Sequence, residues 1–166
     1  MHPVAAKWIR QYQLLPHPEG GYYRETYRAK LTVEANALPP GFDGKRQLST
    51  AIYFLLEAGN FSAFHRIKSD ECWHFYAGDP LYVHVLDTAG QYCLLKLGRV
   101  GEEQFQAIVP AGCWFAAEMA PGGKYALVGC TVSPGFDFAD FELASASALS
   151  EMFPQHQQLI GRLCRQ

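Results

Sequence analysis

The 166-residue sequence has neither a long apolar run nor a strong charge of one sign. Its 14 Lys and Arg residues nearly balance 16 Asp and Glu residues, and no run of Lys and Arg exceeds two residues. A chain without a basic stripe lacks electrostatic attraction to nucleic acid or to an anionic membrane. No segment is apolar for long enough to span a bilayer, and residues 1–15 lack the apolar core of a secretory signal. We therefore expect a cytoplasmic protein with no nucleic-acid or membrane partner.

Paired cysteines and several common catalytic motifs are also absent. The five cysteines include no C-x-x-C pair, and an odd count without a secretory signal predicts reduced thiols. Gly98 and Gly101 are not followed by the Lys and Ser or Thr of a phosphate-binding loop, and Gly20 and Gly21 precede a predicted strand instead of a helix. These absences argue against phosphate-loop, Rossmann, Ser-His-Asp and paired-carboxylate sites. Nucleophilic catalysis by Cys113 stays a minor alternative because no activating base lies near it in the sequence.

The sequence contains instead a regular series of short strand patterns. With 49% hydrophobic and 14% aromatic residues, the chain predicts one packed domain over residues 1–166. A short amphipathic helix is predicted over 4–15, a loop over 31–45, and a helical tail at the end of the chain. The predicted strands are 22–28, 48–56, 61–67, 72–77, 81–86, 92–97, 105–109, 113–117, 125–132 and 136–143. Strands of this length and spacing predict an all-β sandwich or barrel.

The most informative segment runs from Gly59 to Gly78 and reads as strand, turn, strand. It contains His65 and Glu71, which are six residues apart. Residues two apart on a strand face the same side, so His65 and Ile67 are predicted to point together into a barrel. The segment therefore predicts a polar site within an apolar interior.

The spacing of this segment resembles the first signature of the cupin superfamily, G-x5-H-x-H-x3-E-x6-G, in which one hairpin supplies metal ligands. The second cupin signature, P-x-G-x2-H, resembles the segment from Pro110 to Phe115. Ile67 stands where the family has its second histidine, and Phe115 stands where it has its last. Because catalytic metal sites ordinarily use about three protein ligands, we expect a metal-free pocket without a cofactor. A weak metal site on His65 and Glu71 stays open as the less favoured alternative.

Longer segments are similar to one branch of the cupins, the RmlC-like jelly rolls with no assigned reaction. The resemblance implies an all-β fold, a cupin-type double-stranded β-helix (jelly-roll barrel) with a short N-terminal helix, and a homodimer. Likenesses of such proteins to sugar epimerases and to small-ligand binders are analogies at the level of the fold. The similar segments are PHPEGGYYRETYR (16–28), STAIYFLL (49–56), ECWHFYAGDPL (71–81), VPAGCWFAA (109–117) and VGCTVSPGFDFADFEL (128–143).

Two residues are candidates for catalysis. His65 is predicted to act as a general base and Glu71 to orient it, because buried ionisable pairs concentrate at functional sites. In the alternative, Glu71 only neutralises a structural histidine. His74 alternates away from Glu71 along the strand and is expected to be structural. His17 lies in a segment without obvious partners and is expected to be solvated.

Five further residues are candidates for ligand binding. Arg24 is a candidate anchor for an anionic substrate group, with an exposed strand face as the alternative. Ser49 and Tyr53 share a strand face and are candidates for supplying hydroxyl groups to the pocket. Trp73 and Phe115 are predicted to line the barrel and exclude water, with ordinary core packing as the alternative.

Two classes of function follow from these residues. The first is a metal-independent isomerase or epimerase that acts on a small polar, sugar-like molecule. The second is a non-catalytic module that binds a small metabolite. A barrel mouth is a preferred ligand site in either class.

Overall fold

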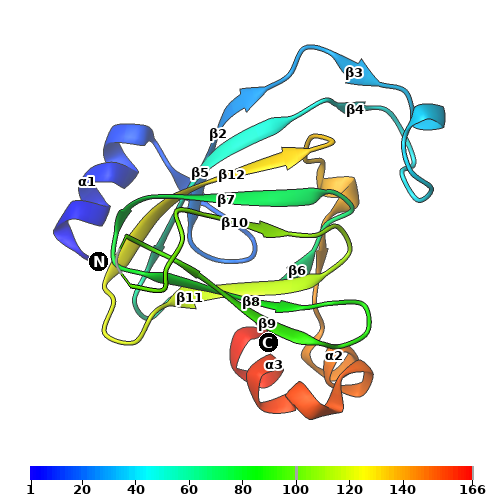
Figure 1. The fold of residues 1–166 in the computed structure, drawn as a ribbon. Helices are drawn as coiled ribbons and strands as arrows, with labels where there is room; N and C mark the ends of the chain where they lie inside the picture. Colours follow the sequence, from blue (N-terminus) through cyan, green and yellow to red (C-terminus); the bar gives the residue numbers. More distant parts are fainter. Residues whose placement is uncertain (100, 166) are drawn as a thin grey trace.

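The computed structural model describes residues 1–99 and 101–165, and within them two antiparallel β-sheets face each other (Figure 1). The strands are β1 (Leu15–Pro16), β2 (Tyr22–Arg28), β3 (Thr32–Val33), β4 (Arg46–Gln47), β5 (Thr50–Glu57), β6 (Phe61–Arg66), β7 (Asp70–Gly78), β8 (Leu81–Leu86), β9 (Tyr92–Leu97), β10 (Gln106–Val109), β11 (Trp114–Met119), β12 (Tyr125–Ser133) and β13 (Glu142–Leu143). The α-helices are α1 (Pro3–Tyr12), α2 (Ala146–Met152) and α3 (Gln157–Leu163), and the 3-10 turns are η1 (Ala35–Ala37), η2 (Phe138–Asp140) and η3 (Pro154–His156). Among these residues, no helix is both long and apolar enough to cross a membrane.

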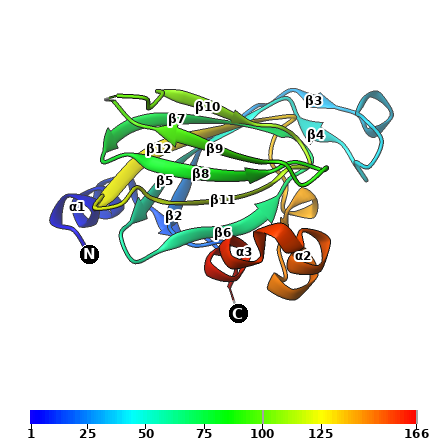
Figure 2. The same ribbon diagram turned by 60° about the horizontal axis from the view of Figure 1, so that its bottom comes forward.

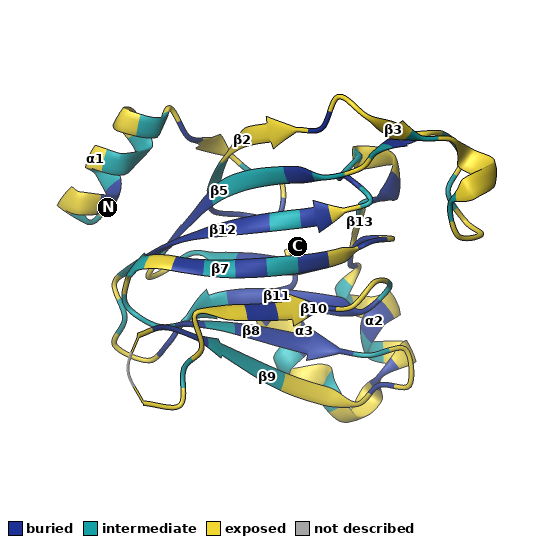
Figure 3. Cartoon of the chain, turned by 45° about the horizontal axis from the view of Figure 1, so that its top comes forward, coloured by how far each residue is buried: buried dark blue, intermediate teal, exposed yellow. Residues whose placement is uncertain are grey.

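The two sheets form a jelly-roll barrel with a mostly apolar interior. One sheet has the order β1-β2-β5-β12-β7-β10, and the other has the order β13-β6-β11-β8-β9. Their inward-facing side chains form the main core, because alternate residues along each strand point to the same face. Figure 3 shows this burial along β5, β12 and β7, in contrast to the exposed β2. The largest core side chains are Phe54, Trp73, Phe115, Leu56, Leu81 and Leu97.

Helices cover the outer faces of both sheets. Helix α1 begins at Pro3, with the His2 ring capping it, and buries Ala5 against Leu55 and Leu127 on the outer face of β5 and β12. Helices α2 and α3 pack their apolar side chains on the outer face of β6 and β11 (Figure 2). The polar site described below therefore lies in the barrel interior, between the two sheets.

The predicted all-β architecture with terminal helices is confirmed, but two segments differ from their predictions. Residues 136–143 were expected to form a strand, and they form η2 followed by the two-residue β13. Asp137 caps this turn through Ala139, and the rings of Phe136, Phe138 and Phe141 pack on one another. Residues 31–45 were expected to be a loop, and they form most of an arm that contains β3 and η1 and returns through β4 (Figure 1).

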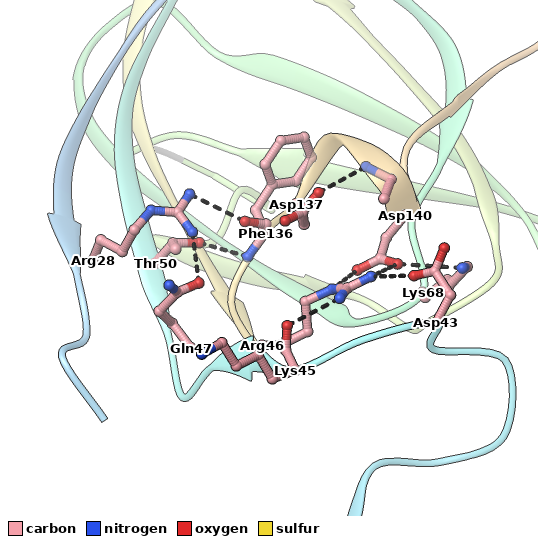
Figure 4. A network of polar contacts seen from close by, with 11 residues as sticks. Arg28, Asp43, Lys45, Arg46, Gln47, Thr50, Lys68, Phe136, Asp137 and Asp140 are labelled. Carbon is pink, nitrogen blue, oxygen red and sulfur yellow. Dashed lines mark hydrogen bonds and ion pairs between the residues drawn. The ribbon is translucent and has the colours of Figure 1, made fainter. Parts of the chain in front are cut away.

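A buried ion pair joins the base of this arm to η2 (Figure 4). Nε and Nη2 of Arg46 donate to the two carboxylate oxygens of Asp140, each at 2.7 Å. The side chains of Arg46 and Asp140 are only 4% and 3% exposed, and Lys68 adds a contact of 3.2 Å to Asp140. A bidentate Arg–carboxylate pair fixes orientation as well as distance. The arm and η2 are therefore held in one arrangement at the mouth of the barrel.

Breaking this pair should destabilise the fold. Arg46→Ala leaves the Asp140 carboxylate buried with only the longer Lys68 contact, so the free energy of unfolding in urea should fall by about 3 kcal/mol. Asp43→Ala is the matched control, because it removes the other carboxylate that Arg46 contacts, whose side chain is 69% exposed. The control should unfold at nearly the wild-type urea concentration. Equal losses in the two variants would contradict the role given to the buried pair.

Candidate functional site

A cavity of about 550 Å³ opens between the two sheets near η2. Most of its wall is apolar, and its ionisable side chains divide into a buried inner group and a rim group. We call Glu19, His65 and Glu71 the inner triad. The lining residues are Leu15, His17, Glu19, Tyr23, Arg24, Glu25, Arg28, Thr50, Ile52, Phe54, His65, Ile67, Glu71, Cys130, Val132, Phe136, Asp137 and Phe138.

Glu19 reaches the inner end because the turn before β2 docks closely on β6. The carbonyl oxygen of Glu19 accepts from Ala63 N at 2.9 Å and from Arg165 Nε at 3.0 Å. Gly20 follows with a φ of 119°, and a Cβ built there would lie 2.1 Å from the Phe61 carbonyl oxygen. Only glycine permits this approach and this backbone conformation. The close contact places the Glu19 side chain inside the barrel, where the residue is 5% exposed.

His65 on β6 contacts Glu19, and its ring orientation follows from a second contact. Nδ1 of His65 lies 2.7 Å from the carbonyl oxygen of Ala63, and Nε2 lies 3.1 Å from Oε2 of Glu19. A carbonyl oxygen can only accept, so Nδ1 carries the hydrogen. The neutral ring then presents Nε2 as an acceptor, and the proton between His65 and Glu19 belongs to the carboxyl group. Burial lowers the pKa of His65 and raises the pKa of Glu19, which favours this neutral pair.

His17 independently indicates the same protonation of Glu19. Its Nδ1 accepts from the backbone N–H of Glu19 at 3.3 Å, so this nitrogen carries no hydrogen. The same Nδ1 lies 3.3 Å from Oε2 of Glu19, while Ser62 donates to Oε1 at 2.8 Å. Oε2 therefore lies between two nitrogen acceptors, from His17 and His65, and is the oxygen suited to carry a proton. The prediction of a solvated His17 is wrong, because its side chain is only 7% exposed.

Glu71 on β7 completes the inner triad. Burial raises its pKa to about 7; nearby His65 lowers the pKa, nearby Glu19 raises it, and a hydrogen bond from the Cys130 thiol lowers it. Near neutral pH, Glu71 therefore populates both its protonated and its ionised form. No hydrogen bond or ion pair joins Glu71 to His65 among the described residues, so Glu19 takes the orienting contact that the sequence predicted for Glu71.

Three of the predicted ligand-binding residues direct their polar groups away from the cavity. Ser49 Oγ donates to the Val132 carbonyl at 3.1 Å and lies outside the cavity lining. Tyr53 packs on Tyr12 at the outer face of the sheet, with a ring-centroid distance of 5.0 Å. Arg24 is the cross-strand neighbour of Tyr53 and therefore shares that outer face. The alternation along β5 was correct, but Thr50, Ile52 and Phe54 form its inward face.

The guanidinium of Arg24 donates to the carbonyl of Tyr12 and to the side chain of Gln13, at the end of α1. Arg24 borders the rim of the cavity, but these bonds use its side chain on the outer surface. The structure therefore does not support Arg24 as the anchor for an anionic substrate. Arg28 lies further along β2, where it pairs with Thr50. Because Thr50 is on the inward face of β5, Arg28 is the arginine nearer the mouth.

Trp73 and Phe115 belong to the core behind the cavity wall. Both are 1% exposed, and neither lines the cavity. The Phe115 ring lies 4.0 Å from the His65 ring, and Trp73 packs edge-on against Phe115 at 6.4 Å between centroids. These rings support His65 from behind, so the core-packing alternative describes them better than direct contact with a ligand.

The residues present do not fit the metal that the cupin signatures imply. Ile67 and the Phe115 ring stand where nitrogen ligands would be required, and both nitrogens of His65 already have hydrogen-bonding partners. No group of three or more His, Cys, Asp or Glu side chains in the described part of the chain has the arrangement of a metal site. The donor chemistry at this position therefore suits proton transfer better than metal ligation.

The sequence did not identify Glu19, His17 or Cys130 as site residues. It also argued against a pair of carboxylates, whereas the structure brings Glu19 and Glu71 to the same cavity end. The sequence feature that could have indicated Glu19 is the His-Pro-Glu-Gly-Gly run at residues 17–21, in which a histidine and a glutamate come just before two glycines. Two adjacent glycines with positive φ mark a close backbone approach, which is how Glu19 enters the barrel.

The barrel and the position of this cavity define a cupin, and comparison with known proteins identifies the family. The chain belongs to the family described as Cupin superfamily (DUF985), whose model matches residues 6–144. Uncharacterized protein YML079W of Saccharomyces cerevisiae is 33% identical over 144 residues, which cover 80% of this chain and 71% of the yeast protein.

Solved structures give the same assignment. Protein SO0799 from Shewanella oneidensis is 41% identical with a TM-score of 0.85, and the match covers 97% of each chain. A hypothetical protein from Leishmania major is 37% identical with a TM-score of 0.88, over 98% of this chain and 99% of its own. Oxalate decarboxylase from Bacillus subtilis, 17% identical with a TM-score of 0.54 over 89% of this chain and 36% of its own, shares the fold alone.

The buried carboxyl of Glu71 predicts a specific dependence of stability on pH. Its pKa rises from 4.5 to about 7 on folding, so between these values the folded state holds more protons than the unfolded state. The contribution of Glu71 to the free energy of unfolding should therefore fall as pH rises from 4.5 to 7, by roughly 3 kcal/mol at about 1.4 kcal/mol per pKa unit. Glu71→Gln keeps the shape of the side chain but cannot titrate.

The measurement is urea unfolding of wild type and Glu71→Gln across this pH range. In both proteins, His65 and His17, whose pKa values are lowered, contribute a slope of the opposite sign, and Glu19, whose pKa is raised, contributes a slope of the same sign as Glu71. The difference between the two curves of unfolding free energy against pH isolates the contribution of Glu71. The unfolding free energy of wild type minus that of Glu71→Gln should decrease as pH rises. Parallel curves would show that Glu71 titrates as an exposed carboxyl.

Proposed function

We propose that this protein binds a small molecule in the barrel cavity and moves a proton on it, as a metal-independent isomerase or epimerase does. The observation that carries the proposal is the convergence of the buried inner triad in a cavity whose wall is mostly apolar. Ionisable side chains whose pKa values are shifted by burial concentrate at functional sites. Carboxyl groups kept in different protonation states by their surroundings can serve as acid and base in one reaction.

The proposed reaction begins with Glu71 as the base. Its carboxylate takes a proton from a carbon next to a substrate carbonyl group, and the electrons of that C–H bond form a C=C double bond. The carbonyl π electrons move to oxygen, which takes the proton of Glu19 and gives an enol. A base with a pKa near 7 is matched to this work at neutral pH.

The second half of the reaction restores both groups. For epimerisation, the enol oxygen returns its proton to Glu19 as its C=O bond re-forms, and Glu71 delivers its proton to the opposite face of the same carbon after the enol turns in the cavity. For isomerisation, the carbon next to the carbonyl must carry a hydroxyl group; Glu71 then delivers its proton to the former carbonyl carbon, and the second hydroxyl gives its proton to Glu19 as it becomes the new carbonyl. His65 accepts from Glu19 while the carboxyl group holds its proton, and Ser62 donates to the Glu19 carboxylate while the proton is on the substrate. No oxidant, reductant or metal enters this scheme.

The non-catalytic alternative also has an observation in its favour. The cavity wall is mostly apolar, so burial of a ligand supplies affinity without any chemistry at the inner triad. His65→Ala separates the two functions. Loss of ligand affinity with no turnover by wild type supports a binding module, whereas loss of measurable wild-type turnover in a folded variant supports the enzyme.

Deuterium exchange provides a direct test of proton transfer. Wild type in D₂O should incorporate deuterium at the carbon next to the carbonyl in at least one member of a panel of ketones and aldehydes, as followed by NMR. Glu71→Gln should lower the exchange rate by at least about 100-fold, because it removes the base. Glu19→Gln should lower it as well, because it removes the acid.

Glu151→Gln is the matched control, since Glu151 is exposed on α2 and remote from the cavity lining. It should exchange at the wild-type rate. Exchange that survives Glu71→Gln, with the folded content unchanged by circular dichroism, would contradict the proposed base. An inactive wild type across the whole panel would favour the binding module.

We also propose that the protein forms a homodimer through β2. Strand β1 pairs only with Tyr22 and Tyr23, so the rest of this sheet edge has no strand partner among the described residues. Exposed strand edges are ordinarily paired or covered in native proteins. Sedimentation at micromolar concentration should give the dimer mass, and Tyr27→Pro should shift the protein towards monomer. A monomer mass for wild type would contradict this proposal.

A further inference from the structure

Among the described residues, no Lys or Arg side chain lines the inner end of the cavity; the nearby Arg165, which lowers the pKa of Glu19, lies outside the lining and donates to the carbonyl oxygens of Glu19 and Phe61. The ionisable groups there are Glu19, Glu71, His65 and His17, and burial lowers the pKa of both histidines. The side chains between this end and the mouth are largely aliphatic and aromatic. They are Tyr23, Ile52, Phe54, Ile67, Val132, Phe136 and Phe138.

The two arginines of the rim do not supply a free cation either. Arg28 forms a two-bond pair with Glu25, at 2.9 Å from Nε and 2.6 Å from Nη2, and also donates to the Phe136 carbonyl at 3.1 Å. Its charge is therefore already balanced by a carboxylate. Arg24 uses its guanidinium on the outer face, at the end of α1. Asp137 adds a further carboxylate to the rim.

An anionic ligand would thus meet several carboxyl groups, while the lining arginines direct their guanidinium groups to Glu25 or, for Arg24, to neutral acceptors at the end of α1 on the outer face. Removing a carboxylate or phosphate group from water without a partner carries a large free-energy penalty. An uncharged carbonyl group, in contrast, needs only a donor, and the carboxyl proton of Glu19 supplies one when it turns from the His65 nitrogen to the bound carbonyl oxygen. The apolar wall favours a hydrocarbon body behind that group.

We infer that the substrate of this site is an uncharged, mostly apolar ketone or aldehyde, and not a phosphorylated or carboxylated sugar. This inference rests on the proposed proton-transfer function and specifies its substrate class. It departs from the sugar-like molecule that the sequence favoured, because the wall offers few polar partners for ring hydroxyl groups. A cavity of about 550 Å³ lies within the ordinary range for small-molecule sites.

A pair of probes with the same shape and different charge tests the inference. 2-Acetylnaphthalene carries a neutral ketone, and 2-naphthoate carries a carboxylate at the same position of the same ring system. Titration of ¹⁵N-labelled wild type at neutral pH should give a dissociation constant for the ketone at least about tenfold below that of the carboxylate. Shifts of cavity residues in the amide spectrum show that both values refer to this site.

A variant at the rim tests the charge argument separately. Glu25→Gln removes the carboxylate that balances Arg28 and leaves the inner triad unchanged. It should tighten naphthoate binding by about threefold, the scale of a partly exposed ion pair, and raise the affinity for naphthoate relative to that for the ketone. Glu34→Gln on the arm makes the same change in net charge outside the cavity and should alter neither affinity.

Equal or tighter binding of naphthoate by wild type overturns the inference, as does failure of the ketone to bind at millimolar concentration. Equal effects of Glu25→Gln and Glu34→Gln also contradict it, because the charge of Arg28 would then be irrelevant at the mouth. All of these outcomes are dissociation constants, so they do not depend on whether the protein catalyses a reaction. If the ketone binds selectively and is never exchanged or converted, the substrate class stands and the proposed catalysis fails.

Discussion

The structure depends on one constraint, which is that two carboxyl groups and an imidazole are buried together with no ion pair from Lys or Arg to either carboxyl group in the described part of the chain. Water is largely excluded from this part of the barrel, so each charge there would be costly. The carboxyl of Glu19 avoids that cost by keeping its proton, directed at the nitrogens of His65 and His17. Glu71 accepts a hydrogen bond from the Cys130 thiol, contacts no histidine nitrogen among the described residues, and has a pKa of about 7. The same constraint makes one group a proton donor and the other a proton acceptor.

The surrounding fold holds these groups in place from several directions. The turn that carries Glu19 is fixed to β6 by backbone bonds and to the end of the chain by Arg165. The ring of Phe115 packs against His65 on the side where related barrels would place another ligand. At the mouth, the Arg46–Asp140 pair fixes η2, which carries Phe138 over the opening. The site is thus assembled from both ends of the chain and from the central strands.

Local patterns in the sequence were sufficient for the barrel and for part of the site. The hairpin from Gly59 to Gly78 gave His65 and Glu71 correct inward positions, because strand alternation is a local property. The face of β5 was assigned wrongly at Tyr53, since alternation alone does not say which side of an isolated strand faces the core. Glu19 was missed because its contact with His65 arises from docking of one segment on another, which no spacing in the sequence encodes.

The proposed chemistry requires the proton between Glu19 and His65 to be on the carboxyl oxygen. Imidazole ¹⁵N chemical shifts of His65, assigned by comparison with His65→Gln, report the protonation of each ring nitrogen directly. At neutral pH we expect a neutral ring with hydrogen on Nδ1 and a hydrogen-bonded, unprotonated Nε2. An imidazolium ring, or hydrogen on Nε2 with Nδ1 unprotonated, would contradict it.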